Sequence, residues 1–136
     1  MRWFWIDQFT EFISGTSSVA IKTVSLSEGY LHDHIPGFPY MSGALIIEGF
    51  AQSGGLLVGE ASGFQERVVL AKVARAEFHD IARPGDTFVL KTQVEDIRPT
   101  GGIISGSCHI GERLLANVEL VFANLDERFA GVDQFI

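Results

Sequence analysis

The sequence has few basic residues, a single cysteine and no long apolar run, and each shortage excludes a class of protein. Lysine and arginine number 10 against 17 acidic residues, so no basic cluster is present to hold nucleic-acid phosphates. Cys108 alone cannot close an internal disulfide, which favours a reducing, cytoplasmic setting. The longest apolar segment, 44–58, is interrupted by Glu48 and Gln52 and is shorter than the ~20 residues of a membrane-spanning helix. We therefore expect neither a nucleic-acid partner nor a membrane span.

Proline and charge are also scarce, whereas apolar residues are abundant. Four prolines and a charged fraction of 20% argue against disorder. Hydrophobic residues make up 46% of the 136 positions and include 11 phenylalanines, which suits one domain with a substantial core and leaves too few residues for two. We expect a single domain over 1–136, with 126–136 as a loose tail, and an oligomer that hides part of the apolar surface.

One helix candidate stands out, at residues 44–58. Ser42 can act as its N-cap, and no proline interrupts it. Apolar or small side chains lie on nearly every side, so we expect other structure to enclose this helix. Gly49, Gly54 and Gly55 each weaken a helix by about 1 kcal/mol relative to alanine, which suggests close packing against a sheet or another backbone.

The second half of the chain alternates between apolar and polar residues, the pattern of half-buried β-strands. The expected strands cover residues 19–26, 68–78, 87–95 and 114–122, with turns at 98–102 and 111–112. One strand, a buried helix and about four further strands predict an α+β fold, with an antiparallel sheet wrapped around one long central helix.

Residues 32–52 combine backbone constraints with acid/base groups. Pro36, Gly37, Pro39 and Gly43 prescribe a stiff loop that leads into the helix. Rigid loops of this kind suit functional groups that must be held in place.

Three groups of this segment suit the elimination of water from a 3-hydroxyacyl thioester. His34 can take and give a proton at neutral pH. Glu48, in the second turn of the buried helix, can donate a proton or anchor a hydroxyl. The Gly43 amide lies at the helix N-terminus, where unpaired N–H groups stabilise a developing enolate oxygen. The elimination needs these three functions: a base, an acid and a donor to the thioester carbonyl.

The stretch His34-Ile-Pro-Gly-Phe-Pro-Tyr-Met-Ser-Gly-Ala-Leu-Ile-Ile-Glu-Gly-Phe-Ala-Gln closely resembles the signature of bacterial 3-hydroxyacyl-[acyl-carrier-protein] dehydratases. That signature reads His, an aromatic residue, Pro-Gly-x-Pro-x-Met-Pro-Gly-x-Leu, then Glu-Ala-x-Ala-Gln. Weaker similarity at 5–7, 19–24 and 83–86 extends the resemblance over most of the chain. The departures are Ile35 for the aromatic residue, Phe38 for an often polar or basic one, Ser42 for a proline and Gly49 for an alanine.

The resemblance implies a hot-dog fold and a homodimer, which in such enzymes often assembles into a trimer of dimers. Each active site would take His34 from one subunit and Glu48 from the other, without a cofactor, with an apolar tunnel for the acyl chain at the interface. Glutamate rather than aspartate at position 48 resembles the elongation dehydratases more than the dehydratase/isomerases. Gln52, one turn after Glu48, is expected to hydrogen-bond Glu48 and support this helix face.

Several alternatives stay open. Phe38 and the net charge of -7 leave a coenzyme A thioester open beside acyl carrier protein as substrate. A hot-dog acyl thioesterase also places a carboxylate on the central helix, and a non-catalytic acyl- or carrier-binding subunit would keep the motif without turnover. His32 and His34 form an HxH pair, which would share one face of a strand, but because no third ligand is apparent we expect no metal. Lys22, Lys72, Arg75, Arg83 and Arg98 could border a carrier-protein site, but scattered charges are expected to be a solvated surface. We expect His79 and His109 to be surface or sheet residues and Cys108 to be a small core residue rather than a nucleophile.

Overall fold

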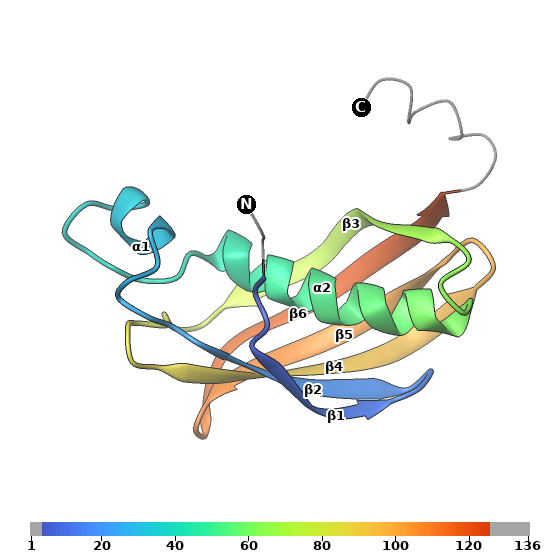
Figure 1. The fold of residues 1–136 in the computed structure, drawn as a ribbon, viewed down its shortest axis with the longest axis horizontal. Coiled ribbons are helices and arrows are strands. Elements are labelled where there is room, and N and C mark those ends of the chain that lie inside the picture. Colours follow the sequence, from blue (N-terminus) through green and yellow to red (C-terminus); the bar gives the residue numbers. More distant parts are fainter. Residues whose placement is uncertain (1–3, 126–136) are drawn as a thin grey trace.

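The computed structural model describes residues 4–125. Its elements are β1 (Gln8–Ile13), β2 (Ser17–Thr23), α1 (Tyr30–Asp33), α2 (Gly43–Ala61), β3 (Arg67–Phe78), β4 (Thr87–Arg98), β5 (Gly101–Ile110) and β6 (Arg113–Leu125). The strands form one antiparallel sheet in the order β1-β2-β4-β5-β6-β3, and α2 lies along one face of it (Figure 1). The predicted α+β class and hot-dog arrangement are confirmed. The expected tail at 126–136 lies outside the described residues.

Alternation along the strands separates the two faces of the sheet. In β4, Phe88, Leu90 and Thr92 are buried on the side of α2, whereas Lys91 and Gln93 at the alternate positions are exposed. Antiparallel pairing aligns buried rows across β2, β4, β5 and β6, so the core lies between the sheet and the helix.

Glycines allow α2 to approach the sheet closely, as the sequence suggests. A Cβ atom added to Gly54 would lie 2.9 Å from Ile104 Cγ1, and one added to Gly49 would lie 3.3 Å from the Trp5 carbonyl oxygen. Gly55 differs, because its added Cβ would only reach ordinary van der Waals contact. Glycine thus weakens the helix at all three positions, but at Gly49 and Gly54 it allows the helix to pack closely against its neighbours.

One side of α2 is not covered by the sheet. Ile46, Phe50 and Leu57 are buried, but Ala44 and Leu56 on the other side are exposed. The expectation that other structure encloses this helix is thus met only on its sheet side, because a single sheet can cover only one face. No helix within residues 4–125 is long and apolar enough to span a membrane.

Two elements, β1 and α1, were not predicted, and β5 was implied only by the turns expected at 98–102 and 111–112. The register of β1 shifts between Phe9 and Glu11, which breaks the alternation that marks a strand. Helix α1 has four residues, too few to show a helical period. Because His32 lies in α1 and His34 immediately follows it, the assumption that both share one face of a strand is wrong.

Among residues 4–125, strand β3 forms one edge of the sheet and pairs only with β6. Of its apolar side chains, Val69 is 40%, Leu70 39% and Val73 43% exposed. A strand of 12 residues with apolar side chains and unpaired backbone groups is a surface that proteins normally cover or pair.

Candidate acid/base site

The loop between α1 and α2 carries His34 and is held in place at both ends. His34 is the C-cap residue of α1 and is exposed. Gly37 has φ +79°, a left-handed conformation that glycine adopts without strain. Met41 is buried, and its N–H donates to the Ala82 carbonyl at 2.9 Å. The stiff loop predicted from its prolines and glycines is thus also tied to the segment between β3 and β4.

Tyr40 is the hydrogen-bond partner of His34. Nε2 of His34 lies 2.9 Å from the Tyr40 hydroxyl oxygen, and the two ring centroids are 5.2 Å apart. The Phe38 ring packs on the other ring edge, with its centroid 5.5 Å from that of Tyr40. Sequence reasoning missed Tyr40, because the signature leaves this position open.

Helix α2 begins with free backbone donors. Ser42 is its N-cap residue, as predicted, but its side chain makes no capping hydrogen bond. The N–H groups of Leu45 and Ile46 both donate to the Ser42 carbonyl. Within residues 4–125 no hydrogen bond from the Gly43 N–H is found, so this donor is available to an anionic oxygen.

Phe78, the last residue of β3, explains why position 43 is glycine. A Cβ atom at Gly43 would lie 2.7 Å from Cζ of the Phe78 ring, which is closer than side-chain contacts allow. The ring therefore packs against the start of α2, beside Gly43. Nothing in the sequence pattern pairs Phe78 with Gly43, because the contact depends on the tertiary fold.

Gln52 connects Glu48 to the N-terminal segment. Its side-chain Nε2 donates to Glu48 Oε1 at 3.3 Å, and its Oε1 accepts a hydrogen bond from the Trp5 N–H at 2.9 Å. Glu48 itself is half-buried. Gln52 thus orients one oxygen of the carboxyl group and is in turn held by backbone.

His34 and Glu48 do not meet within one protomer. No hydrogen bond or ion pair joins them in the part of the chain that the structure describes, and each has a different partner. Figure 1 places α1 and the His34 loop beyond the N-terminal end of α2. A chemical step that uses both groups therefore needs a substrate that spans them, a movement of the loop or a second chain.

Three other titratable residues, Cys108, His32 and His79, are either buried in the core or hydrogen-bonded within the fold. Burial raises the pKa of the Cys108 thiol to about 12, so this thiol stays protonated, in keeping with a core residue. His32 bonds the Leu26 carbonyl, and His79 bonds Asn117. No group of three or more His, Cys, Asp or Glu side chains in residues 4–125 could hold a metal ion.

Lys22 corrects one expectation, because it is not a solvated surface charge. It is 6% exposed, and its ammonium group lies 3.1 Å from Glu28 Oε1 and 3.6 Å from Asp7 Oδ1. These two ion pairs tie β2 to the segments on either side of it, and the buried ammonium group is not available to a carrier protein.

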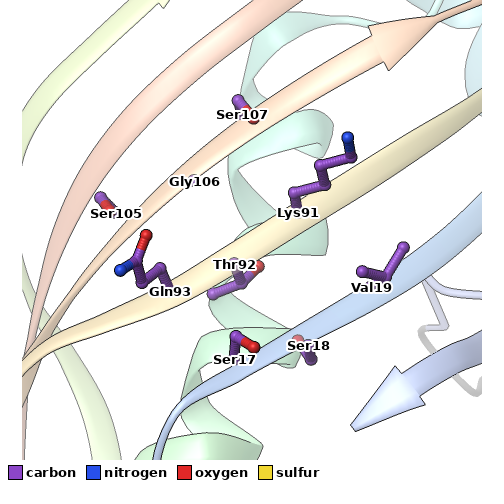
Figure 2. Close-up of a pocket in the computed structure, with 9 residues that line it drawn as sticks. All are labelled: Ser17, Ser18, Val19, Lys91, Thr92, Gln93, Ser105, Gly106 and Ser107. Atoms are coloured by element: carbon purple, nitrogen blue, oxygen red, sulfur yellow. The ribbon is translucent and has the colours of Figure 1, made fainter. Parts of the chain in front are cut away.

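A shallow polar groove of about 410 Å³ lies on the opposite face of the sheet (Figure 2). Lys91, Gln93 and Ser105 point into it from β4 and β5, away from the helix. Thr92 of the same strand points the other way, with its hydroxyl 3.1 Å from that of Ser53 on α2. The sheet thus separates this groove from His34, Gly43 and Glu48.

Comparisons with known proteins show the family of this chain. A family model described as a FabA-like domain matches residues 4–121. The chain is 34% identical over 119 residues to the 3-hydroxyacyl-[acyl-carrier-protein] dehydratase FabZ of Pelotomaculum thermopropionicum, covering 87% of this chain and 85% of that protein.

Two solved structures share the fold. The dehydratase heterocomplex ApeI:P from Xenorhabdus doucetiae matches with a TM-score of 0.77 at 15% identity, over 97% of this chain and 88% of that one. The structure of smu.793 from Streptococcus mutans bound to acetyl CoA matches with a TM-score of 0.68 at 14% identity, over 92% and 93%. At these identities the likeness concerns the fold.

Proposed function

Because this chain belongs to the FabA-like family, we propose that it dehydrates (3R)-hydroxyacyl thioesters on acyl carrier protein to trans-2-enoyl thioesters, in fatty-acid or lipid biosynthesis. The identity to a FabZ dehydratase over most of both chains supports the reaction. The observation that carries the proposal is the start of α2. There the unpaired Gly43 N–H follows a loop that bears an imidazole and precedes the Glu48 carboxyl group by five residues of the helix.

The reaction divides among three groups. The His34 imidazole removes a proton from C2 of the substrate, and the electron pair passes to the thioester carbonyl as an enolate. The Gly43 N–H donates a hydrogen bond to the enolate oxygen, assisted by the positive end of the helix dipole. Glu48 protonates the 3-hydroxyl, which leaves as water when the C2–C3 double bond forms. The His34 imidazolium then releases its proton to solvent, and the Glu48 carboxylate takes one up, which restores both groups.

Two further contacts act on Glu48 and Gly43. Gln52 fixes the Glu48 carboxyl group through the hydrogen bond to Oε1, while the Phe78 ring packs beside Gly43 at the start of the helix. A donor held in place strengthens the interaction of the amide with a developing negative charge.

We further propose that the working unit is a homodimer whose two sheets join along β3. An antiparallel β3 pair would satisfy the open edge and cover Val69, Leu70 and Val73. It would also explain the uncovered side of α2, where Leu56 is 42% exposed. In this arrangement His34 of one protomer works with the Glu48 side chain of its partner, and dimers can assemble further into a trimer of dimers.

Substitution of the two proton-transfer groups tests the reaction. The variants His34→Ala and Glu48→Gln should each lower the hydration rate of a crotonyl thioester by roughly 10²–10⁴-fold, the usual contribution of general acid/base catalysis. Circular dichroism and light scattering provide the control that fold and assembly are intact. Near-wild-type rates in either folded variant would refute the assignment of that residue.

The same assay separates two other activities. A thioesterase would release a free thiol from the substrate, detectable with a chromogenic disulfide, whereas dehydration leaves the thioester bond intact. A binding subunit would take up acyl carrier protein without any change in thioester absorbance. Since position 48 holds glutamate, as in the elongation dehydratases, we propose that the product is the trans-2 isomer alone.

The carrier and the compartment complete the proposal. Parallel assays with acyl carrier protein and coenzyme A thioesters decide between the two carriers, and we expect the carrier-protein substrate to give the higher kcat/KM. We also propose a cytoplasmic setting, supported by the single buried thiol, since a lone free cysteine suits a reducing compartment.

A further inference from the structure

We propose that Lys22 is a positioning residue that anchors both proton-transfer groups of its protomer. Through Glu28 it holds the helix that ends at His34, and through the N-terminal segment it holds the side chain that orients Glu48. This inference rests on the proposed roles of His34 and Glu48 in dehydration. It gives a functional reason for a buried ammonium group that lies outside the signature at 34–52.

The Lys22 ammonium group lies between carboxylates from two different segments of the chain. It is 3.1 and 3.3 Å from the two carboxylate oxygens of Glu28, and 3.6 Å from Asp7 Oδ1. It also lies 6.0 Å from the centre of the Trp5 ring. A buried ammonium group is unfavourable unless acceptors of this kind replace its water. The position of Lys22 is therefore tied to Asp7 and Glu28 at the same time.

Glu28 connects Lys22 to His34. The Glu28 carboxylate also accepts the Ser25 N–H at 3.1 Å, and its backbone carbonyl accepts the Leu31 N–H at 3.2 Å. Helix α1 has only four residues, and Leu31 is its one buried side chain, so it has little packing of its own. Because His34 is the C-cap residue of α1, the direction that the chain takes at Glu28 decides where the imidazole lies.

The N-terminal segment connects Lys22 to Glu48. Asp7 pairs with the ammonium group through Oδ1, and its Oδ2 accepts the Thr23 N–H at 2.7 Å, which holds this segment against β2. Two residues earlier, the Trp5 N–H donates to Gln52 Oε1 at 2.9 Å. Because a backbone N–H can only donate, this bond turns Oε1 of the amide toward Trp5 and leaves Nε2 to face Glu48.

The two connections meet at the Trp5 ring. This buried ring packs edge-on against the ring of Tyr30, the first residue of α1, with the centroids 4.8 Å apart. A displacement of the Lys22 ammonium group is therefore transmitted both to α1 and to the segment that holds Gln52. A shift of about 1 Å in the groups of an active site lowers the rate although none of them is lost.

The test removes the ammonium group with the variant Lys22→Met, which keeps an unbranched apolar side chain. With a crotonyl thioester as the probe, kcat should fall by roughly 10–10²-fold because the catalytic groups are misaligned, while KM changes by less than about twofold. Lys22→Arg keeps a cation and should give a higher kcat than Lys22→Met. Lys91→Met makes the same chemical change at an exposed position of the neighbouring strand β4 and should keep the wild-type kcat.

Two milder variants examine each connection separately and stay informative if Lys22→Met does not fold. Glu28→Gln acts on the connection to His34, and Asp7→Asn acts on the connection to Glu48. Each should lower kcat by about threefold or more, because a charge-assisted contact becomes a neutral one. In the background of Lys22→Met, Glu28→Gln should have little further effect on kcat, since its partner is already absent.

All rates are measured at a temperature at which circular dichroism and light scattering show each variant folded and assembled like the wild type. Under these conditions a residue that only adds stability leaves kcat unchanged. A wild-type kcat in Lys22→Met overturns the inference, as does a wild-type kcat in both Glu28→Gln and Asp7→Asn. A lowered kcat in only one of the two carboxylate variants overturns the claim that Lys22 serves both groups.

The outcomes separate this inference from the proposed function. If His34→Ala and Glu48→Gln are inactive while folded Lys22→Met is fully active, the role of Lys22 falls and the dehydratase assignment stands. If His34→Ala or Glu48→Gln keeps its activity, the proposed function falls, and the inference that rests on it falls too.

Discussion

Single residues in this protein owe their chemical state to burial more than to charge. Cys108 is fully buried on β5, where no nearby cation favours the thiolate, so the pKa of its thiol rises from 9.0 to about 12. Between these two pKa values, the folded chain thus keeps the thiol proton that the unfolded chain releases. We therefore interpret Cys108 as a core residue rather than a nucleophile.

This difference in pKa makes stability depend on pH. The free energy of unfolding should fall as pH rises from about 9 toward 12, because only the unfolded chain then releases the thiol proton. Urea unfolding at pH 7.5, 9 and 10.5 measures the decrease, with Cys108→Ala as the reference that lacks this titration. Equal pH slopes for the two proteins would contradict the prediction, as would rapid labelling of native Cys108 by iodoacetamide at pH 8.

At the level of elements, the start of α2 and the end of β3 depend on each other. The variant Gly43→Ala forces a Cβ into the Phe78 ring, so the ring or the helix start must move. We expect a loss of about 1–3 kcal/mol of stability, typical of overpacking. Because the Gly43 amide would also shift, kcat should fall by at least about tenfold.

Two further variants make this test specific. The variant Gly29→Ala is the matched control, since an added Cβ there meets nothing within 4 Å. Combining Gly43→Ala with Phe78→Ala removes the clash, and the double variant should regain stability relative to Gly43→Ala. No recovery would mean that the ring is not what excludes a side chain at position 43.

The elements and the site differ in how well local sequence predicts them. Strands β4 and β6 alternate clearly, and α2 carries a long apolar run, so periodicity predicts them close to their observed bounds. Strand β1 was missed because of its register shift, and α1 because it is short.

For the site, the signature predicts which residues matter but not what they touch. It includes His34, Gly43, Glu48 and Gln52 as a linear pattern. The ring of Phe78 and the Trp5 backbone partner of Gln52 come from segments more than 30 residues away, so only the folded chain brings them to the site.

At the scale of the whole molecule, the proposed dimer predicts complementation between inactive chains. His34→Ala keeps Glu48, and Glu48→Gln keeps His34, so a mixed dimer contains one complete site. Unfolding and refolding an equal mixture should restore roughly a quarter of the wild-type activity, because half of the dimers are mixed and each has one working site of two. Continued inactivity of a verified mixed dimer would place both groups of a site in one chain.

A charge placed on the open edge of β3 tests the proposed dimer interface. The variant Val73→Lys places an ammonium group on the open edge of β3 and should yield monomers in light scattering, with loss of activity although every proposed catalytic group is present. Ile97→Lys, which alters an apolar residue of 36% exposure on β4, serves as the control and should remain a dimer. A Val73→Lys variant that is monomeric and active would contradict the proposal that two protomers share each site.

The separation of His34 from Glu48 within one protomer has an evolutionary consequence. When each chain supplies a different group to a shared site, a duplicated gene can lose the histidine in one copy and the glutamate in the other while the pair still functions. Selection would then act on the two copies together, and neither could be lost without the other. If the proposed dimer shares its sites in this way, two mutations would turn it into an obligate heterodimer.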